Sequence, residues 1–298
     1  MTTALPKKKP VATWALAYLY LAPALIFILV IFVYPVLNLI WRSLTQVTEG
    51  VTRWAGLESY RATLSDPVFW QALSNNLRLF LAVPVLVVLS LIISSIIFEQ
   101  IRGWRVYRTI VFIPYVLAIP VVAIVFNNVL QLHGVFNTFL SSIGLKSLTT
   151  DWLGTSRTAI WAIMFVVIWK ELGFGVILFL ARMSSISEEL FDAAKLDGAN
   201  WFQRLWNVTI PQIATVIEFY VVIELITMFS WVFAYILVMT KGGPGTSTWV
   251  MEFFIYEKAF PYSQMRIASA GAILVLFFAS ILMFFQARLR HRVEDING

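Results

Sequence analysis

The sequence predicts an all-α protein with a single transmembrane domain of about six membrane-spanning helices. Hydrophobic residues make up 60% of its 298 residues and charged residues only 13%, whereas soluble domains are about half apolar and about a quarter charged. The apolar residues also form blocks that reach the roughly 20 residues a helix needs to cross a bilayer. These six blocks lie near 13–41, 72–98, 105–131, 157–181, 212–240 and 266–287.

The blocks differ in their proline content, which predicts where helices bend. Pro84 lies inside the second block, and Pro114 and Pro120 lie inside the third. A proline within a helix removes one backbone donor and kinks the chain. We therefore expect bent helices here, a feature of transport paths and of ordinary helix packing alike.

The charged residues argue against several classes of protein. The net charge is +6, but the basic residues lie at the ends of apolar blocks and form no single patch, so we expect no nucleic-acid partner. The sequence has no cysteine, which excludes disulfides and thiolate chemistry, and its two histidines are scattered. We therefore predict no metal site.

Lys and Arg at the ends of the blocks predict the orientation of the chain. Such residues are retained on the cytoplasmic side when they lie in short loops. They precede the first block, fill the tight loop after the second and follow the last: Lys7, Lys8, Lys9, Arg102, Arg105, Arg108, Arg288, Arg290 and Arg292. Both termini are thus predicted to be cytoplasmic, with a mobile N-terminus at 1–12, a transmembrane domain at 13–290 and a tail at 291–298.

A polar stretch at 184–211 separates the fourth and fifth blocks, on the predicted cytoplasmic side. Ser187 can cap a helix whose first turn holds two glutamates, and Gly198 can end that helix in a left-handed conformation. Asn200 can cap a second short helix that runs to Pro211. Helical spacing puts Leu190, Ala193, Ala194 and Asp197 on one face, which predicts a narrow surface that another protein can approach closely.

This stretch carries a recognisable motif. Asp192-Ala193-Ala194, followed by Gly198 and by Ile210-Pro211, resembles the EAA motif of ABC importer permeases, with Asp in place of the usual Glu. The resemblance implies a bundle like that of type I ABC importer permeases, whose coupling helix docks on a cytoplasmic ATPase. The alternative is an amphipathic helix on the membrane surface. The resemblance to ABC importer permeases implies these coupling residues: Glu189, Leu190, Asp192, Ala193, Ala194, Asp197 and Gly198.

A second match lies on the extracytoplasmic side, in the segments 237–244 and 256–260. The loop Gly242-Gly243-Pro244 resembles the sugar-transport branch, specifically subunits similar to the larger maltose permease and the first glycerol-phosphate permease. A plain turn is the alternative, because glycine and proline form turns in any protein. The resemblance covers nearly the whole chain, including Ile113-Pro114-Tyr115 in the third block.

Polar residues inside the fourth block suggest a substrate site. Lys170 and Glu171 interrupt it, and Phe174 shares a face with Lys170 one turn away. Sugars suit charged groups beside an aromatic ring. A structural ion pair explains the same residues equally well. The resemblance points to Tyr115, Lys170, Glu171, Phe174, Thr227, Met228, Ser230 and Trp231 as substrate contacts.

Two further sequence details bear on this site. The maltose permease is asparagine-rich where this chain has Met228, Ser230 and Trp231, so a different sugar is expected. The buried Glu224 could pair with Arg78.

The resemblance also implies which components accompany this chain. The sequence contains no phosphate-binding loop and no hydrolase or zinc-protease motif. We therefore expect a non-catalytic subunit that binds no cofactor, with ATP and Mg on a partner ATPase. The implied partners are a second homologous permease, two copies of the ATPase, an extracytoplasmic substrate-binding protein and membrane lipid, in a bacterial or archaeal cytoplasmic membrane.

Taken together, these residues predict a pore subunit that moves a sugar or sugar derivative by alternating access. One alternative is an ABC permease for another nutrient, because the EAA motif does not specify the substrate. Another is a secondary transporter that uses Lys170, Glu171 and Glu224 as ion sites. An intramembrane enzyme is the weakest alternative.

Overall fold

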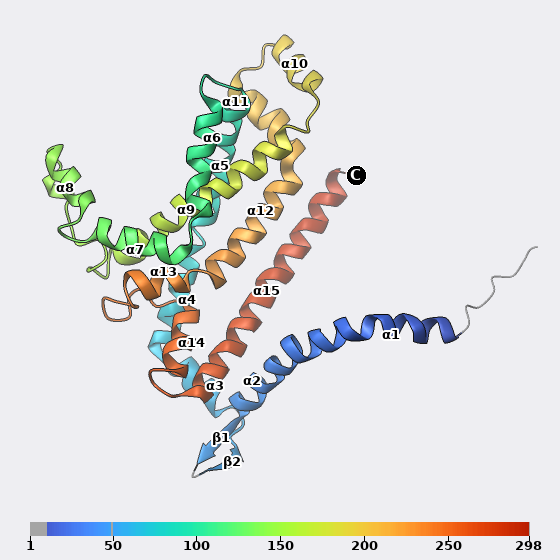
Figure 1. The fold of residues 1–298 in the computed structure, drawn as a ribbon, viewed down its shortest axis with the longest axis vertical. Coiled ribbons are helices and arrows are strands. Elements are labelled where there is room, and N and C mark those ends of the chain that lie inside the picture. The colour runs from blue at the N-terminus through green and yellow to red at the C-terminus, as the bar shows by residue number, and fades with distance from the viewer. Residues whose placement is uncertain (1–10, 49, 298) are drawn as a thin grey trace, which may run out of the picture.

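The computed structural model describes residues 11–48 and 50–297 and confirms the all-α prediction (Figure 1). The predicted N-terminal stretch with Lys7, Lys8 and Lys9 falls mostly outside these residues. The helices are α1 (Val11–Ile28), α2 (Tyr34–Leu44), α3 (Glu58–Ser65), α4 (Pro67–Leu79), α5 (Ala82–Phe98), α6 (Trp104–Val116), α7 (Ile119–Leu130), α8 (Val135–Ser142), α9 (Ala159–Met183), α10 (Glu188–Leu196), α11 (Trp201–Arg204), α12 (Ile210–Ser230), α13 (Phe233–Met239), α14 (Met251–Ala259) and α15 (Met265–Asn297). Shorter turns of other helix types are η1 (Leu29–Val33), η2 (Lys146–Leu148) and η3 (Leu205–Thr209).

One small hairpin interrupts the helical fold. Strands β1 (Thr45–Thr48) and β2 (Val51–Trp54) pair antiparallel, with Thr45 opposite Trp54. The hairpin lies at one end of the molecule, and α10 lies at the opposite end (Figure 1). On the predicted orientation, these are the extracytoplasmic and cytoplasmic ends.

Within the described residues, four helical segments are long and apolar enough to cross a membrane: Tyr18–Leu44, Pro67–Phe98, Ala159–Met183 and Trp201–Ser230. The bent pair α6 and α7 makes a fifth candidate, and Met265–Ile281 is a shorter apolar helix. Each predicted block overlaps one of these segments. The count of six spans stays a prediction.

The third block is broken more sharply than a simple kink. Its two halves, α6 and α7, meet at 99°. Leu117 and Ala118 between them are extended. Pro120 has no N–H with which to continue the hydrogen-bond ladder to the carbonyl of Val116, which weakens the helix at this point.

Helix α9 lies at the centre of the bundle and packs against α5, α6 and α12. Its middle is almost entirely buried. Gly173 allows α6 to approach closely, because a Cβ atom there would lie 2.4 Å from the carbonyl oxygen of Val111. This close packing fixes the position of the polar residues that α9 carries.

The first span does not join this core. Helix α1 runs away from the bundle (Figure 1), and no part of the apolar window of Tyr18–Leu44 is buried against the rest of the described chain. Only α2, at its end, packs against α15 and α3. An apolar surface of this extent needs lipid or another protein to cover it.

Candidate coupling and substrate sites

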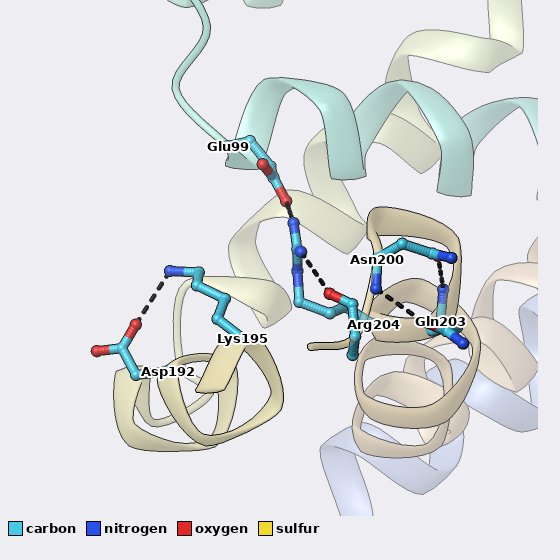
Figure 2. Close-up of polar contacts among 7 residues, drawn as sticks. Glu99, Asp192, Lys195, Asn200, Gln203 and Arg204 are labelled. Carbon is cyan, nitrogen blue, oxygen red and sulfur yellow. Dashed lines mark hydrogen bonds and ion pairs between the residues drawn. The ribbon is translucent and has the colours of Figure 1, made fainter. Parts of the chain in front are cut away.

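The polar stretch 184–211 folds as α10, a tight turn and α11. Helix α11 does not end at Pro211 as predicted, because it continues through η3 into α12 as one helical segment, Trp201–Ser230. Gly198 has φ +76° and ends the first helix, α10, as predicted. Asn200 and Gln203 form a capping box that starts α11: Asn200 Oδ1 accepts from the Gln203 N–H at 2.9 Å, and Gln203 Oε1 accepts from the Asn200 N–H at 2.8 Å (Figure 2). Ser187 occupies the N-cap position of α10, but its side chain makes no capping bond, so the predicted cap bond is wrong.

The residues implied in ATPase coupling lie on the surface of this unit. Helix α10 buries none of its residues against the described chain. Asp192 forms an ion pair with Lys195 at 3.0 Å, and both side chains are more than half exposed (Figure 2). Ala194 is half-buried, and the other six implied residues are exposed: Glu189, Leu190, Asp192, Ala193, Asp197 and Gly198.

Two residues outside the motif attach this unit to the bundle. Arg204 on α11 forms an ion pair with Glu99 at the end of α5 (Figure 2). Neither residue was predicted from the sequence. Glu99 directly follows the second apolar block and Arg204 lies within the polar stretch, but no local pattern indicates that residues 105 positions apart meet.

Lys170 and Glu171 form a buried ion pair in the middle of α9. Lys170 Nζ lies 3.2 Å from Glu171 Oε1, and both residues are only 6% exposed. Lys170 Nζ also donates to the Tyr115 carbonyl at 3.2 Å and lies 5.1 Å from the centre of the Tyr115 ring. That carbonyl belongs to the last turn of α6, where a cation suits the negative end of the helix dipole.

Three aromatic rings extend from this pair. Tyr115 stacks on Phe174 with ring centres 5.1 Å apart, and Phe174 contacts Tyr220 at 5.8 Å. Tyr220 was missed in the sequence, although it lies one helical turn from Glu224. Glu224 is fully buried. Its suggested pairing with Arg78 is wrong, because Arg78 donates instead to Asn75 Oδ1 at 3.2 Å.

The predicted patch on the fifth span is less uniform. Met228 is fully buried, whereas Trp231 is 61% exposed. Thr227 is half-buried and Ser230 is exposed. Within the described part of the chain, no side-chain hydrogen bond or ring contact links these four residues to Lys170 or Phe174.

The loop Gly242-Gly243-Pro244 packs closely against the residues that follow it. Gly242 has φ +82°, and a Cβ atom there would lie 2.5 Å from the rings of Phe253 and Trp249. Only glycine fits this position without strain. The Gly243 carbonyl accepts a hydrogen bond from Thr248 Oγ1 at 2.9 Å.

Helix α4 holds the chain that follows this loop. Asn75 Nδ2 donates to the carbonyls of Ser247 and Trp249, and Asn76 Oδ1 accepts from the backbone N–H of Met251 at the start of α14. These two carboxamides were missed in the sequence. Their signal was two adjacent polar residues within an apolar block, which are costly in a membrane unless they are bonded.

Comparisons with known proteins agree with this geometry. Residues 71–295 match the family described as "Binding-protein-dependent transport system inner membrane component". The probable ABC transporter permease protein YurN of Bacillus subtilis is 34% identical over 91% of this chain and 94% of its own. The lactose transport system permease protein LacF of Rhizobium radiobacter is 30% identical over 92% of this chain and 94% of its own.

The fold is also similar to that of solved transporters. A chain of a bacterial ABC transporter involved in the import of the acidic polysaccharide alginate superposes with a TM-score of 0.82 at 25% identity, covering 95% of this chain and 97% of the other. An exposed loop with the EAA-type motif, a buried polar cluster around Lys170 and Glu171, and a tightly packed loop at Gly242 thus occur on a fold that this transporter shares. The chain belongs to the family of inner membrane components of binding-protein-dependent transport systems, the permease subunits of ABC importers.

Proposed function

We propose that this chain is one pore-forming subunit of an ATP-driven importer, and that it moves a sugar or sugar derivative by alternating access. The observation that carries the proposal is the exposed helix α10, with its EAA-type residues, at one end of the bundle. A helix that buries none of its residues is suited to contact with another subunit. The chain itself performs no catalysis.

The partners follow from this role. A cytoplasmic ATPase in two copies binds ATP and Mg and contacts α10. A second homologous permease completes the pore, and an extracytoplasmic binding protein delivers the substrate at the end that carries the β1–β2 hairpin. Both termini lie in the cytoplasm, and the chain holds no cofactor or metal.

The sugar preference rests on the relatives' names and on the buried cluster. One relative transports lactose by its name, and the related solved transporter imports alginate. Tyr115 and Phe174 provide stacked rings for the apolar face of a sugar, and Lys170 and Glu171 provide polar groups beside them. Thr227, Met228, Ser230 and Trp231 are the proposed contacts on the fifth span.

Uptake measurements test this proposal. Cells that lack the gene and cells that carry it on a plasmid are given radiolabelled lactose, maltose, trehalose, sn-glycerol 3-phosphate or glutamine. We expect plasmid-dependent uptake of a sugar or sugar derivative that stops when the partner ATPase is inactivated. Uptake of glutamine alone would favour a permease for another nutrient, and uptake that is independent of the ATPase would contradict an ABC importer.

A further inference from the structure

One arginine joins the predicted cytoplasmic end of α5 to residues 184–211, the coupling unit. Arg204 Nη2 contacts the Glu99 carboxylate, while its Nη1 donates to the Ala199 carbonyl at 3.1 Å (Figure 2). Ala199 directly follows Gly198, in the turn that links α10 to α11. One guanidinium therefore ties the turn behind the coupling helix to the end of a membrane-spanning helix.

Within the described residues, α10 packs against η3 and makes few other contacts. The ring of Phe191 on α10 lies 5.2 Å from that of Phe98 on α5. Beside these contacts a half-open cavity of about 410 Å³ separates α10 from α5 and α11. Its lining includes Glu99, Asp192 and Arg204. A displacement of α10 can therefore reach α5 at only a small number of points.

The Glu99–Arg204 ion pair is better protected from water than the Asp192–Lys195 ion pair. The Arg204 side chain is 15% exposed and that of Glu99 is 42% exposed, whereas Lys195 and Asp192 are both more than half exposed. A fully exposed ion pair contributes little, because water screens it. A charge-assisted bond to a mostly buried guanidinium is stronger and more directional.

Helix α5 leads from this pair toward the buried polar cluster. It makes its most extensive packing with α9, and Ser90 Oγ on α5 donates to the Leu172 carbonyl on α9 at 3.4 Å. Leu172 follows Lys170 and Glu171 directly. Glu99 thus stands at the outer end of a continuous packed route between the coupling unit and the middle of the membrane.

We propose that the Glu99–Arg204 ion pair is a positioning link, which transmits movement of the coupling helix α10 to α5. The inference deepens the proposed function and rests on it, because the movement is the one that an ATPase would impose on α10. The two residues act through the helices that they join and need not touch ATPase or substrate.

The first experiment tests the link in the chain itself. Because the sequence has no cysteine, Ile101→Cys and Leu196→Cys introduce two unique, exposed labelling positions, one beside α5 and one at the end of α10. Spin labels there report the distance between the two elements in the full chain in lipid nanodiscs. We expect a narrow distribution for the parent chain, a broad one for Arg204→Gln, and a partly narrowed one when Glu99→Arg and Arg204→Glu exchange the charges, because the exchange rebuilds the ion pair but leaves the Ala199 carbonyl without its donor.

Arg182→Gln is the matched control. Arg182 is also a cytoplasmic arginine, but it donates to Ser185 within its own segment. This variant should keep the parent distribution. A width unchanged in Arg204→Gln, or a charge exchange that restores nothing, would overturn the link.

The second experiment measures the consequence for transport, with the sugar found in the uptake panel. Glu99→Gln and Arg204→Gln should lower the sugar taken up per ATP hydrolysed by about 2- to 5-fold, the size of effect that loss of a partly exposed ion pair can produce. The exchanged pair should recover at least half of the parent ratio. Parent-like coupling in both single variants would overturn the inference. If the parent chain takes up no sugar, the proposed function fails, and the label distances still decide on the link.

Discussion

Glu252 shows how a single buried carboxyl group can make the stability of this protein depend on pH. It lies in the first turn of α14, outside the membrane-spanning segments, and both of its carboxylate oxygens are buried. Burial raises its pKa to about 8, and its own backbone amide offsets this only in part. The folded protein therefore holds a proton on Glu252 at a pH where the unfolded chain has lost it.

The sign of the effect follows from this difference. Below about pH 4.5 both states are protonated, and Glu252 does not oppose folding. As pH rises toward about 8, the unfolded chain ionises first, so the free energy of unfolding falls. Glu252→Gln should abolish this fall and raise the melting temperature at pH 8 more than at pH 5, as measured by intrinsic fluorescence in detergent. Glu257→Gln, half-buried on the same helix, should keep the parent pH dependence; an identical response of the two variants would contradict this explanation.

Lys170 and Glu171 allow the structural and substrate hypotheses to be separated. Lys170→Met would leave Glu171 buried without its cation and the Tyr115 carbonyl without its donor. Removing one partner of a buried pair costs about 3–5 kcal/mol. We expect a loss of this size in the free energy of unfolding in detergent mixtures, and a smaller loss when Lys170→Met and Glu171→Gln are combined. A stable Lys170→Met protein with weakened sugar uptake would instead assign Lys170 to substrate binding alone.

At the level of elements, the turn between α10 and α11 invites a direct test of coupling. Gly198 has φ +76°, and no other atom lies within 4 Å of the place where its Cβ would be. Gly198→Leu therefore strains the backbone by about 1–2 kcal/mol and places bulk on the exposed coupling surface. We expect normal insertion into the membrane but lower uptake per ATP hydrolysed.

Gly144 provides the matched control for this variant. It has φ +86° and equally open surroundings, but it lies after α8, away from the coupling unit. Gly144→Leu adds the same strain and bulk there, and uptake should stay near the parent level. Equal losses in both variants would indicate a general folding defect and would count against docking at α10.

The elements also show which features can be predicted from the sequence. The Gly198 turn and the Asn200 cap were predictable because their signals lie within a few residues of the structure that they produce. The bond from Asn75 to Trp249 joins residues 174 positions apart, and nothing local indicates it. The prolines predicted a bend near Pro120 but not the 99° break, because that angle depends on how α7 packs against α13 and α9.

For the whole molecule, the position of the first span also could not be predicted from the sequence. Its apolar block was evident from composition, yet its separation from the bundle was not, because hydropathy reports only that a segment avoids water. The substrate residues divide in a similar way. Tyr115, Lys170 and Phe174 come together in the structure, while Trp231 is exposed on another element.

The proposal that a partner subunit hydrolyses ATP and this chain does not can be tested on the whole protein. The sequence has no phosphate-binding loop, and the exposed helix α10 is the surface that we propose for contact with a separate ATPase. The purified chain in nanodiscs should therefore release no phosphate from ATP above the background of empty nanodiscs. The complex with the ATPase and the second permease should hydrolyse ATP, and do so faster when loaded binding protein is added. A complex with Gly198→Leu should lose much of this stimulation while Gly144→Leu keeps it, because only the first change affects the proposed coupling surface. Phosphate release by the chain alone would contradict the proposed role of a non-catalytic subunit.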